Sequence, residues 1–232
     1  ALAEIEAATR ESRLPVVVGG TGLYLRALID GIARIPPVPT GVRRAVRERL
    51  ARDGAPALHA ELARRDPETA ARLVPQDAQR IARALEVLDA TDRPLSDWIR
   101  GGVDGPRASL RFHVILLMPS RDAVYGAIDA RFRAMVAAGA LDEVRSLAAS
   151  GLDPALPAMK ALGVPELLRH LSGDLPLDEA IRCGQQATRR YAKRQMTWFR
   201  HQLDADQVIS TQYSERLRPE IFSQISSFLL TS

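Results

Sequence analysis

The feature that most constrains the fold is an apolar run that ends in glycines and passes into a helical pattern. The run "VVV", Val16–Val18, is β-branched and is bounded by Pro15 and Gly19, which is typical of a short buried strand. From Leu23 to Ile29 the apolar residues recur at helical spacing. Strand, glycine turn and helix in this order predict a parallel α/β unit.

The glycine turn "GGTG" does not have the pattern of a phosphate-binding loop. The pattern G-x-x-x-x-G-K-[ST] occurs nowhere in the 232 residues, and the turn matches neither this pattern nor G-x-G-x-x-G. The single cysteine, Cys183, excludes an intramolecular disulfide, fits a reducing compartment and is expected as a small half-buried side chain. The sequence shows no zinc-ligand spacing, no G-x-S-x-G elbow and no recognisable hydrolytic triad.

The α/β pattern is interrupted by a long helical segment. Residues 30–41 hold three prolines and two glycines, and only helical signals follow from Val42 to Arg100. A turn-rich linker over 101–110 precedes "RFHVILLM", Arg111–Met118, which reads as a second buried strand. We therefore predict a discontinuous α/β core of residues 1–36 and 110–232, with a helical insertion over 37–109.

Further helices are predicted on either side of this insertion. The first covers residues 1–12, and two helices follow Met118, with Ser120 or Asp122 as N-cap and Gly151 as C-cap. The last strong element runs from about Leu177 to His201.

This last helix carries an unusual charge pattern. Between Ala180 and Leu203 there are six Lys or Arg residues and no acid. One face holds Arg189, Lys193 and Arg200, with Arg190, Arg194 and Thr197 beside them, and the other holds Tyr191, Trp198 and Phe199. An ordinary surface helix mixes signs to gain i,i+4 pairs, so the pattern favours a phosphate-bearing partner over a merely solvated face.

Two further basic clusters lie in the helical insertion. In "PQDAQRIARALEVLDA" the residues Ile81, Leu85 and Leu88 form a buried stripe, and Gln79, Arg80 and Arg83 project from the opposite side. The segment "PTGVRRAVRERLARDG" adds a third cluster, which consists of Arg43, Arg44, Arg47, Arg49 and Arg52. Three clusters in different places indicate an extended polyanion, for which RNA is the obvious example in a cytoplasmic protein, although charge alone leaves DNA open as well.

Two further features of the sequence bear on the cellular location of the protein and on its N-terminal part. No apolar run approaches the roughly 18 residues of a membrane span, and no leader precedes the first helix, so we expect a cytoplasmic protein without membrane contact. The chain begins at Ala1 inside a helical pattern with no initiator Met, and we expect that an N-terminal part is absent.

Four motifs, "VVVGGTGLYLRAL", "QRIARALEV", "RFRAMVAAGALDEVRSL" and "ATRRYAKRQMTWFR", together resemble the tRNA dimethylallyltransferases, also called tRNA isopentenyltransferases. The likeness keeps its order and spacing from about Leu14 to His201, and the last motif is the most specific. It implies a P-loop NTPase-like α/β fold with a parallel-sheet core and a helical insertion that grips the tRNA anticodon stem-loop. The implied reaction transfers a dimethylallyl group from dimethylallyl diphosphate to the exocyclic amine of the adenosine 3′-adjacent to the anticodon, with magnesium.

The resemblance also implies that part of the active site is missing. In the family, the first P-loop strand and helix, the catalytic Asp and most magnesium ligands lie upstream of the residues in this chain. The chain alone is therefore expected to bind tRNA better than it catalyses, and no metal ligand is assigned within it. A monomer is expected.

Site residues are carried over by their positions in the motifs. Thr21 is expected to hydrogen-bond the target adenosine or to orient the general base, and Arg131 to bind the leaving diphosphate. The residues expected to contact tRNA are Arg43, Gln79, Arg80, Ile81, Ala82, Arg83, Lys160, Ala161, Leu162, Gly163, Lys193, Arg194, Gln195, Met196, Thr197, Trp198, Phe199 and Arg200.

One motif departs from the family. The family commonly has an aromatic residue after the glycine of "MKALGVPEL", where this chain has Val164 and Pro165, so 160–163 could equally be a plain loop before a helix. Three functions stay open at this point: a tRNA prenyltransferase, a non-catalytic RNA-binding module, and a relative of P-loop nucleoside or nucleotide kinases. The kinase is disfavoured because three basic surfaces exceed what a nucleotide needs.

Overall fold

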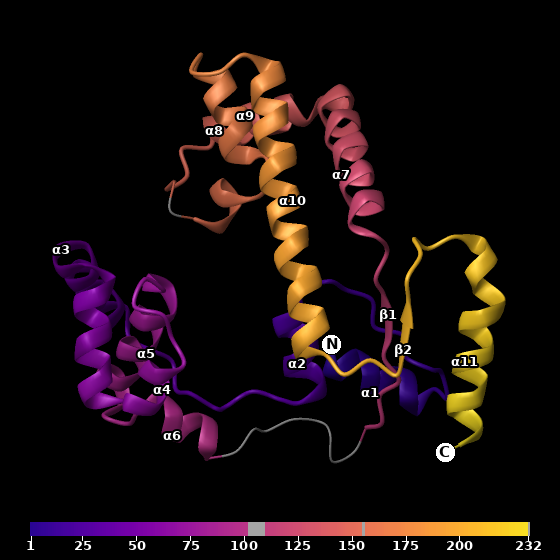
Figure 1. Ribbon diagram of the computed structural model, residues 1–232, viewed down its shortest axis with the longest axis horizontal. Helices are drawn as coiled ribbons and strands as arrows, with labels where there is room; N and C mark the ends of the chain where they lie inside the picture. Colours follow the sequence, from indigo (N-terminus) through magenta and orange to yellow (C-terminus); the bar gives the residue numbers. More distant parts are fainter. Residues whose placement is uncertain (102–109, 155, 232) are drawn as a thin grey trace. The chain divides into compact units, whose positions relative to one another are not determined.

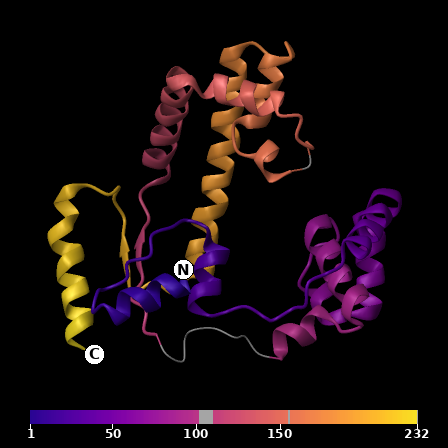
Figure 2. The same ribbon diagram turned by 180° about the vertical axis from the view of Figure 1, so that it is seen from behind.

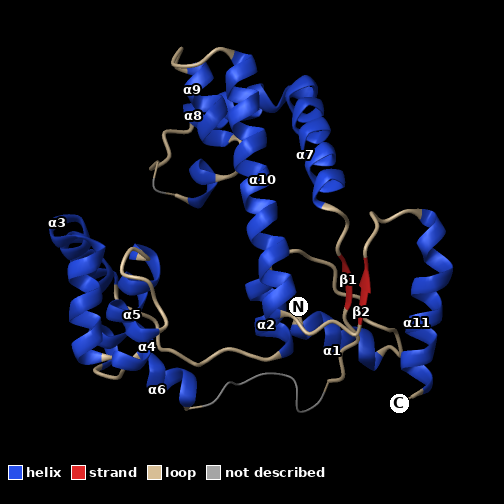
Figure 3. Ribbon diagram, in the orientation of Figure 1, coloured by secondary structure: helices blue, strands red, loops and turns tan. Residues whose placement is uncertain are grey.

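The computed structural model describes residues 1–101, 110–154 and 156–231, which are mostly helical (Figure 3). The chain divides into two compact units. The first consists of Ala1–Val18 and Leu23–Arg111, and the second of Gly19–Gly22 and Phe112–Ser232. The predicted domain boundaries, 1–36 with 110–232 and 37–109, stay a prediction.

The helices up to Arg100 agree with the sequence pattern. They are α1 (Leu2–Arg10), α2 (Gly22–Ile29), α3 (Thr40–Arg65), α4 (Pro67–Ala71), α5 (Ala78–Thr91) and α6 (Leu95–Arg100), labelled in Figure 1. In the first unit α3 packs against α5 around Val46, Leu62, Ile81 and Leu85, each 0% exposed. The predicted stripe on α5 is thus confirmed, and each such side chain contributes about 1.5–3 kcal/mol by burial.

Helix α3 bends at Gly54, whose φ of 79° and ψ of 164° are not helical. A positive φ of this kind suits glycine, because a Cβ would strain the backbone there. Both halves of α3 reach one core, since Val46 precedes the bend and Leu58 and Leu62 follow it.

A buried aspartate joins three helices of the first unit. Asp66 is 1% exposed and caps α4, accepting a hydrogen bond from Thr69 N at 3.1 Å. Ser96 at the start of α6 donates to the same carboxylate through Oγ at 2.7 Å and through its backbone N at 3.2 Å. Burial raises the pKa of Asp66, but these hydrogen bonds outweigh it and hold the pKa below its ordinary value.

The second unit contains a two-stranded parallel sheet and a set of helices. Strands β1 (Ile115–Leu117) and β2 (Gln207–Ile209) pair with Ile115 opposite Gln207, and they lie side by side in Figures 1 and 2. The other elements are α7 (Arg121–Met135), the π-helical turn η2 (Val136–Ala140), α8 (Leu141–Ala149), η3 (Pro157–Lys160), α9 (Val164–Leu171), α10 (Leu177–Gln202), η4 (Glu215–Leu217) and α11 (Arg218–Leu230).

Several predicted features of the second unit are confirmed. The long helix ends within one residue of the predicted position, and Ser120 caps α7 by accepting from Ala123 N at 3.3 Å. Cys183 is half-buried, as expected, whereas the C-cap of α8 is Ser150, one residue before the predicted Gly151, whose φ is 62°. The strand predicted over Arg111–Met118 is shorter than expected, covering only Ile115–Leu117.

The strand predicted over Val16–Val18 is wrong. These residues are not in a strand, and their side chains are 69%, 46% and 91% exposed. An apolar run becomes a strand only where a neighbouring strand satisfies its backbone hydrogen bonds, and within the described residues none pairs with it.

Helix α10 is fixed against α7 by one ring and one ion pair. Phe132 of α7 is 6% exposed and lies against two glycines, Gly163 and Gly184, where an added Cβ would lie less than 3.0 Å from the ring. Arg189 donates from one guanidinium nitrogen to both carboxylate oxygens of Asp129, at 2.9 and 2.7 Å. Gln185 Nε2 donates to the backbone oxygen of Asp129 at 3.0 Å.

Within residues 1–101, 110–154 and 156–231, no helix combines the length and hydrophobicity needed to cross a membrane.

Candidate nucleic-acid interface

The basic residues of α10 fall into two groups. Arg189 is paired with Asp129, and Arg182 forms an ion pair with Glu179, whose pKa the guanidinium lowers through a side-chain hydrogen bond. The other four cations are exposed and have no carboxylate partner among the described residues: Arg190, Lys193, Arg194 and Arg200. We call these four, with the exposed Thr197 between them, the α10 basic stripe.

The geometry of the stripe suits a phosphate backbone. At about 100° per residue its members fall within roughly 120° of the helix circumference, and at about 1.5 Å rise they extend over about 15 Å. Uncompensated cations on one face attract an extended polyanion and release its counterions. Arg189 lies on the same side of the helix as Lys193 and Arg200, but its guanidinium is paired with Asp129, so Arg189 is not counted in the stripe.

The predicted aromatic back of α10 is only partly present. Phe199 is 9% exposed and Trp198 is half-buried, with the two rings 5.6 Å apart and nearly perpendicular. Tyr191 instead is 41% exposed, and the Arg194 guanidinium lies 5.8 Å from its ring centroid. Tyr191 lies on the same side of α10 as Trp198 but two helical turns earlier. The segment Gly20–Gly22 contacts α10 only further along, at Gln195 and Trp198.

The glycine turn is held by α10. Gln195 Nε2 donates to the backbone oxygen of Gly20 at 2.6 Å, and a Cβ on Gly20 would lie 2.5 Å from that nitrogen. A Cβ on Gly22 would lie less than 3.0 Å from the Trp198 ring. Thr21, between these two contacts, is exposed and directly precedes α2. Gly20 and Gly22 therefore permit the turn to approach α10 closely. The sequence pattern did not predict the contact of Gln195 with this turn.

The residues of the segment 160–163 differ in how far they are buried. Lys160, Ala161 and Leu162 are exposed at the end of η3, whereas Gly163 is buried against Phe132 with φ of 93°. The helix expected after this loop begins at Val164 as α9. Arg131, the expected diphosphate ligand, is exposed on α7 and forms no ion pair with the residues described.

In the first unit the predicted contacts on α5 also separate into two sets. Gln79, Arg80 and Arg83 are exposed, as their helical position predicted. Ile81 at 0% and Ala82 at 6% exposure lie in the core, so their side chains are not available to a ligand, and the expectation that these two residues contact tRNA stays a prediction. They are adjacent to the polar face in sequence but point the other way, because successive helical residues differ by about 100°.

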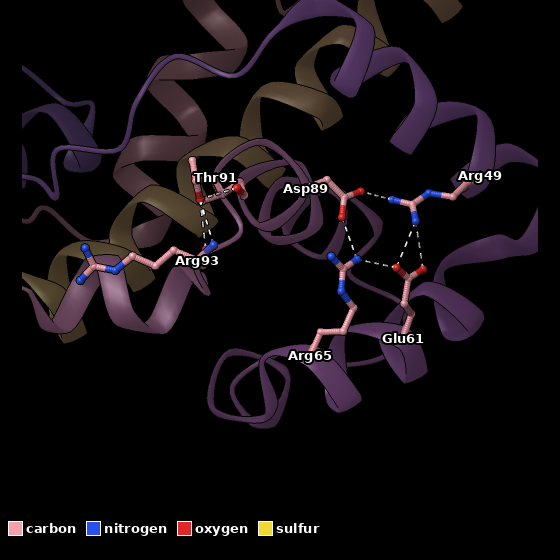
Figure 4. Close-up of polar contacts among 7 residues, drawn as sticks. Arg49, Glu61, Arg65, Asp89, Thr91 and Arg93 are labelled. Atoms are coloured by element: carbon pink, nitrogen blue, oxygen red, sulfur yellow. Dashed lines mark hydrogen bonds and ion pairs between the residues drawn. The ribbon is translucent and has the colours of Figure 1, made fainter.

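The arginine cluster of α3 is smaller than predicted. Arg44 lies 3.9 Å from Glu48, and Arg52 contacts Asp53 at 2.8 Å. Arg49 and Arg65 each bridge Glu61 and Asp89 (Figure 4), and the bonds to Asp89 and Glu61 hold the pKa of Arg65 above its ordinary value despite burial. Arg43 and Arg47 are left exposed, without a carboxylate partner in the described part of the chain.

Figure 4 also shows how the end of α5 is joined to the turn that follows it. Thr91 Oγ1 accepts from the backbone N of Arg93 at 3.3 Å. The same hydroxyl also accepts from Trp98 Nε1 at 3.2 Å. The Arg93 guanidinium lies 4.5 Å from the Trp98 ring centroid, which makes this arginine a packing residue.

The candidate interface contains no evident metal centre. In the parts of the chain that the structure describes, no three His, Cys, Asp or Glu side chains are placed to hold a metal ion. The described residues also give the Thr21 hydroxyl no hydrogen-bond partner. The arrangement can bind a polyanion and present a threonine.

Comparison with known proteins gives consistent matches. The model of the IPP transferase family matches residues 1–202. The chain is 62% identical over 205 residues to a tRNA dimethylallyltransferase of Rhodospirillum centenum, covering 88% of this chain and 65% of that protein. A tRNA dimethylallyltransferase of Nitrobacter hamburgensis is 58% identical over 203 residues, covering 88% and 64%. The chain thus spans less than two thirds of the length of these curated relatives.

A solved structure is similar in fold. The crystal structure of a eukaryotic dimethylallyltransferase acting on tRNA matches with a TM-score of 0.76 at 22% identity, covering 99% of this chain and 60% of that one. This likeness confirms the expected P-loop-like fold class. The expectation that a first strand and helix are missing stays a prediction.

Proposed function

Because the chain belongs to the IPP transferase family, we propose that it serves in tRNA prenylation, transferring a dimethylallyl group from dimethylallyl diphosphate to an adenosine of tRNA. The carbon–nitrogen bond forms as the carbon–oxygen bond to the diphosphate breaks, and the amine loses a proton. The adenosine proposed is the one 3′-adjacent to the anticodon, and the proposed site of action is the cytoplasm.

The observation that carries this proposal is the arrangement around α10. One face of the helix presents the α10 basic stripe, and the other holds the turn that exposes Thr21. The stripe supplies cations for the tRNA phosphates, and Thr21 supplies a hydroxyl for the adenosine amine or its base. Both features lie in the second unit.

Other surfaces fit the same substrate. Gln79, Arg80 and Arg83 on α5, with Arg43 on α3, form exposed groups suited to the anticodon stem. Lys160, Ala161 and Leu162 are exposed and available to tRNA, and Arg131 to the departing diphosphate. The described residues do not provide a ligand set for magnesium, so no step is assigned to the metal here. We propose that the protein acts as a monomer.

The reaction is tested by incubating the protein, alone and fused to an N-terminal segment of the kind that the family has upstream, with labelled dimethylallyl diphosphate, magnesium and tRNA. We expect label in a tRNA with adenosine 3′ of the anticodon and none in the same tRNA with guanosine there. Thr21→Ala should lower kcat by about 10² if the hydroxyl contacts the reacting groups, whereas Thr21→Ser should retain most activity. If neither this chain nor the same chain fused to such an N-terminal segment labels the adenosine tRNA, the transferase proposal is refuted.

A second candidate is a non-catalytic tRNA-binding module. It is favoured by one observation, that the Thr21 hydroxyl has no hydrogen-bonded carboxylate among the described residues. In the same experiment such a module binds both tRNAs equally, with strong salt dependence, and labels neither.

A further inference from the structure

We propose that Gln195 and Trp198 are positioning residues that hold the Thr21 backbone for the reaction, and that they do not contact tRNA. This inference rests on the proposed function and assigns part of the predicted tRNA-binding run 193–200 to a different task.

The Gln195 hydrogen bond fixes the peptide unit that leads into Thr21. The oxygen of Gly20 and the backbone nitrogen of Thr21 belong to one planar peptide group. Because Gln195 Nε2 donates to this oxygen at 2.6 Å, it sets the orientation of the whole plane. The amide is partly buried, so water competes less for the carbonyl than it would at an exposed site.

The Trp198 ring fixes the residue on the other side of Thr21. Gly22 lies so close to the ring that a Cβ would overlap it, and the ring itself packs edge-on against the buried Phe199. The two neighbours of Thr21 are therefore both held by α10, whereas Thr21 itself is exposed. A threonine with a fixed backbone and an open side chain is suited to contact a substrate.

The direction of each side chain separates the two tasks on α10. On the helix, Gln195, Trp198 and Phe199 are centred roughly opposite the α10 basic stripe. Gln195 and Trp198 are half-buried and Phe199 is buried, while Lys193, Arg194, Thr197 and Arg200 are exposed. One rigid helix thus joins the surface proposed for tRNA phosphates to the turn that carries Thr21.

The kinetic test compares Gln195→Ala with Lys193→Ala in the form of the protein, this chain alone or fused to the N-terminal segment, that transfers label in the test of the proposed function. For Gln195→Ala we expect kcat at saturating tRNA to fall about tenfold to a hundredfold, with the Kd for tRNA unchanged. The reason is that a displaced Thr21 slows the reaction but leaves the residues that bind the tRNA phosphates in place. Lys193→Ala should instead weaken tRNA binding. Gln186→Ala is the matched control, since Gln186 is exposed on the same helix.

A double-mutant cycle then separates positioning from general damage. If Gln195 acts through Thr21, adding Gln195→Ala to Thr21→Ala should lower kcat little further than Thr21→Ala alone does. Gln195→Glu keeps the size and shape of the side chain but loses the N–H donor when it is ionised. It should therefore lower kcat as Gln195→Ala does. Additive losses, or a Gln195→Ala protein that loses tRNA affinity with kcat unchanged, would overturn the proposal.

A readout without activity distinguishes this inference from the proposed function. The ¹³C chemical shift of the Gly20 carbonyl carbon, which responds to a hydrogen bond at that oxygen, should change in Gln195→Ala and Gln195→Glu relative to the parent protein and stay the same in Gln186→Ala. If no form of the parent protein transfers a prenyl group, the proposed function fails, yet the shift change still supports the tether. An unchanged Gly20 carbonyl shift in both Gln195 variants overturns the proposal.

Discussion

At the scale of single residues, burial decides which polar side chains serve the fold and which stay available to a ligand. Asp66 and Arg83 are both charged residues of the helical segment. Asp66 is 1% exposed and receives hydrogen bonds from Thr69 and Ser96, whereas Arg83 is exposed beside Glu86 at 3.6 Å. Their types alone do not separate these roles, since each is common on helix surfaces.

The Asp66 carboxylate should make stability depend on pH. Its pKa is lower in the folded protein than in the unfolded chain, so its contribution is present above the unfolded pKa of about 3.9 and is lost as pH falls further. Asp66→Asn should cost about 1–3 kcal/mol of unfolding free energy at pH 7, because the Asn NH2 group that replaces Oδ2 cannot accept from the Ser96 N–H. Urea unfolding at pH 7 and pH 3 measures this.

The comparison has an internal control. The difference between the parent protein and Asp66→Asn should narrow at pH 3, whereas Asp204→Asn, at an exposed position, should change little at either pH. An equal difference at both pH values would contradict the role given to ionised Asp66.

At the scale of the element, α10 combines neighbouring arginines with different roles. Arg189 contacts Asp129, and Arg190, the next residue, is exposed in the α10 basic stripe. The helical period predicted the length of this helix and its charged side. It could not indicate that Arg189 is paired, because Asp129 lies 60 residues away in sequence and meets it only through the packing of α7.

We expect substitution of the two arginines to separate stability from binding. Arg189→Ala leaves a partly buried carboxylate unpaired and should cost about 1–2 kcal/mol of unfolding free energy, with little effect on the Kd for tRNA. Arg190→Ala should leave stability within about 0.5 kcal/mol and reduce the slope of log affinity against log salt by about 1. Urea titration and tRNA binding at several salt concentrations measure both, and the opposite pattern would reverse the two assignments.

At the scale of the whole molecule, the helical segment has a core of its own. The buried cluster that joins α3, α4 and α5 is formed by Val46, Leu58, Leu62, Ala70, Ile81, Ala82, Ala84, Leu85 and Leu88. The polar joint at Asp66 and the network of Arg49, Glu61, Arg65 and Asp89 also lie inside it. A segment with its own core and internal polar contacts has the properties of an independent domain.

A fragment of residues 40–100 should therefore fold alone. We expect a helical circular dichroism spectrum and one cooperative urea transition, because its core lies entirely within the fragment. Leu62→Ala in this fragment should lower the free energy of unfolding by about 2–5 kcal/mol, since Leu62 is 0% exposed. A fragment that is unstructured at neutral pH would show that residues 37–109 are not a domain.

The sequence by itself determined the helices, the stripe of Ile81, Leu85 and Leu88, the basic character of α10 and the family, because these depend on local periodicity and on motifs that one segment carries whole. Tertiary structure decided the exposed state of Val16–Val18, the pairing of Arg189 and the contact of Gln195 with Gly20. Each of these features depends on residues that are distant in sequence. A strand needs a partner strand, the Arg189 cation needs a carboxylate, and the Gly20 carbonyl needs a hydrogen-bond donor. Which distant group meets which is fixed only when the elements pack.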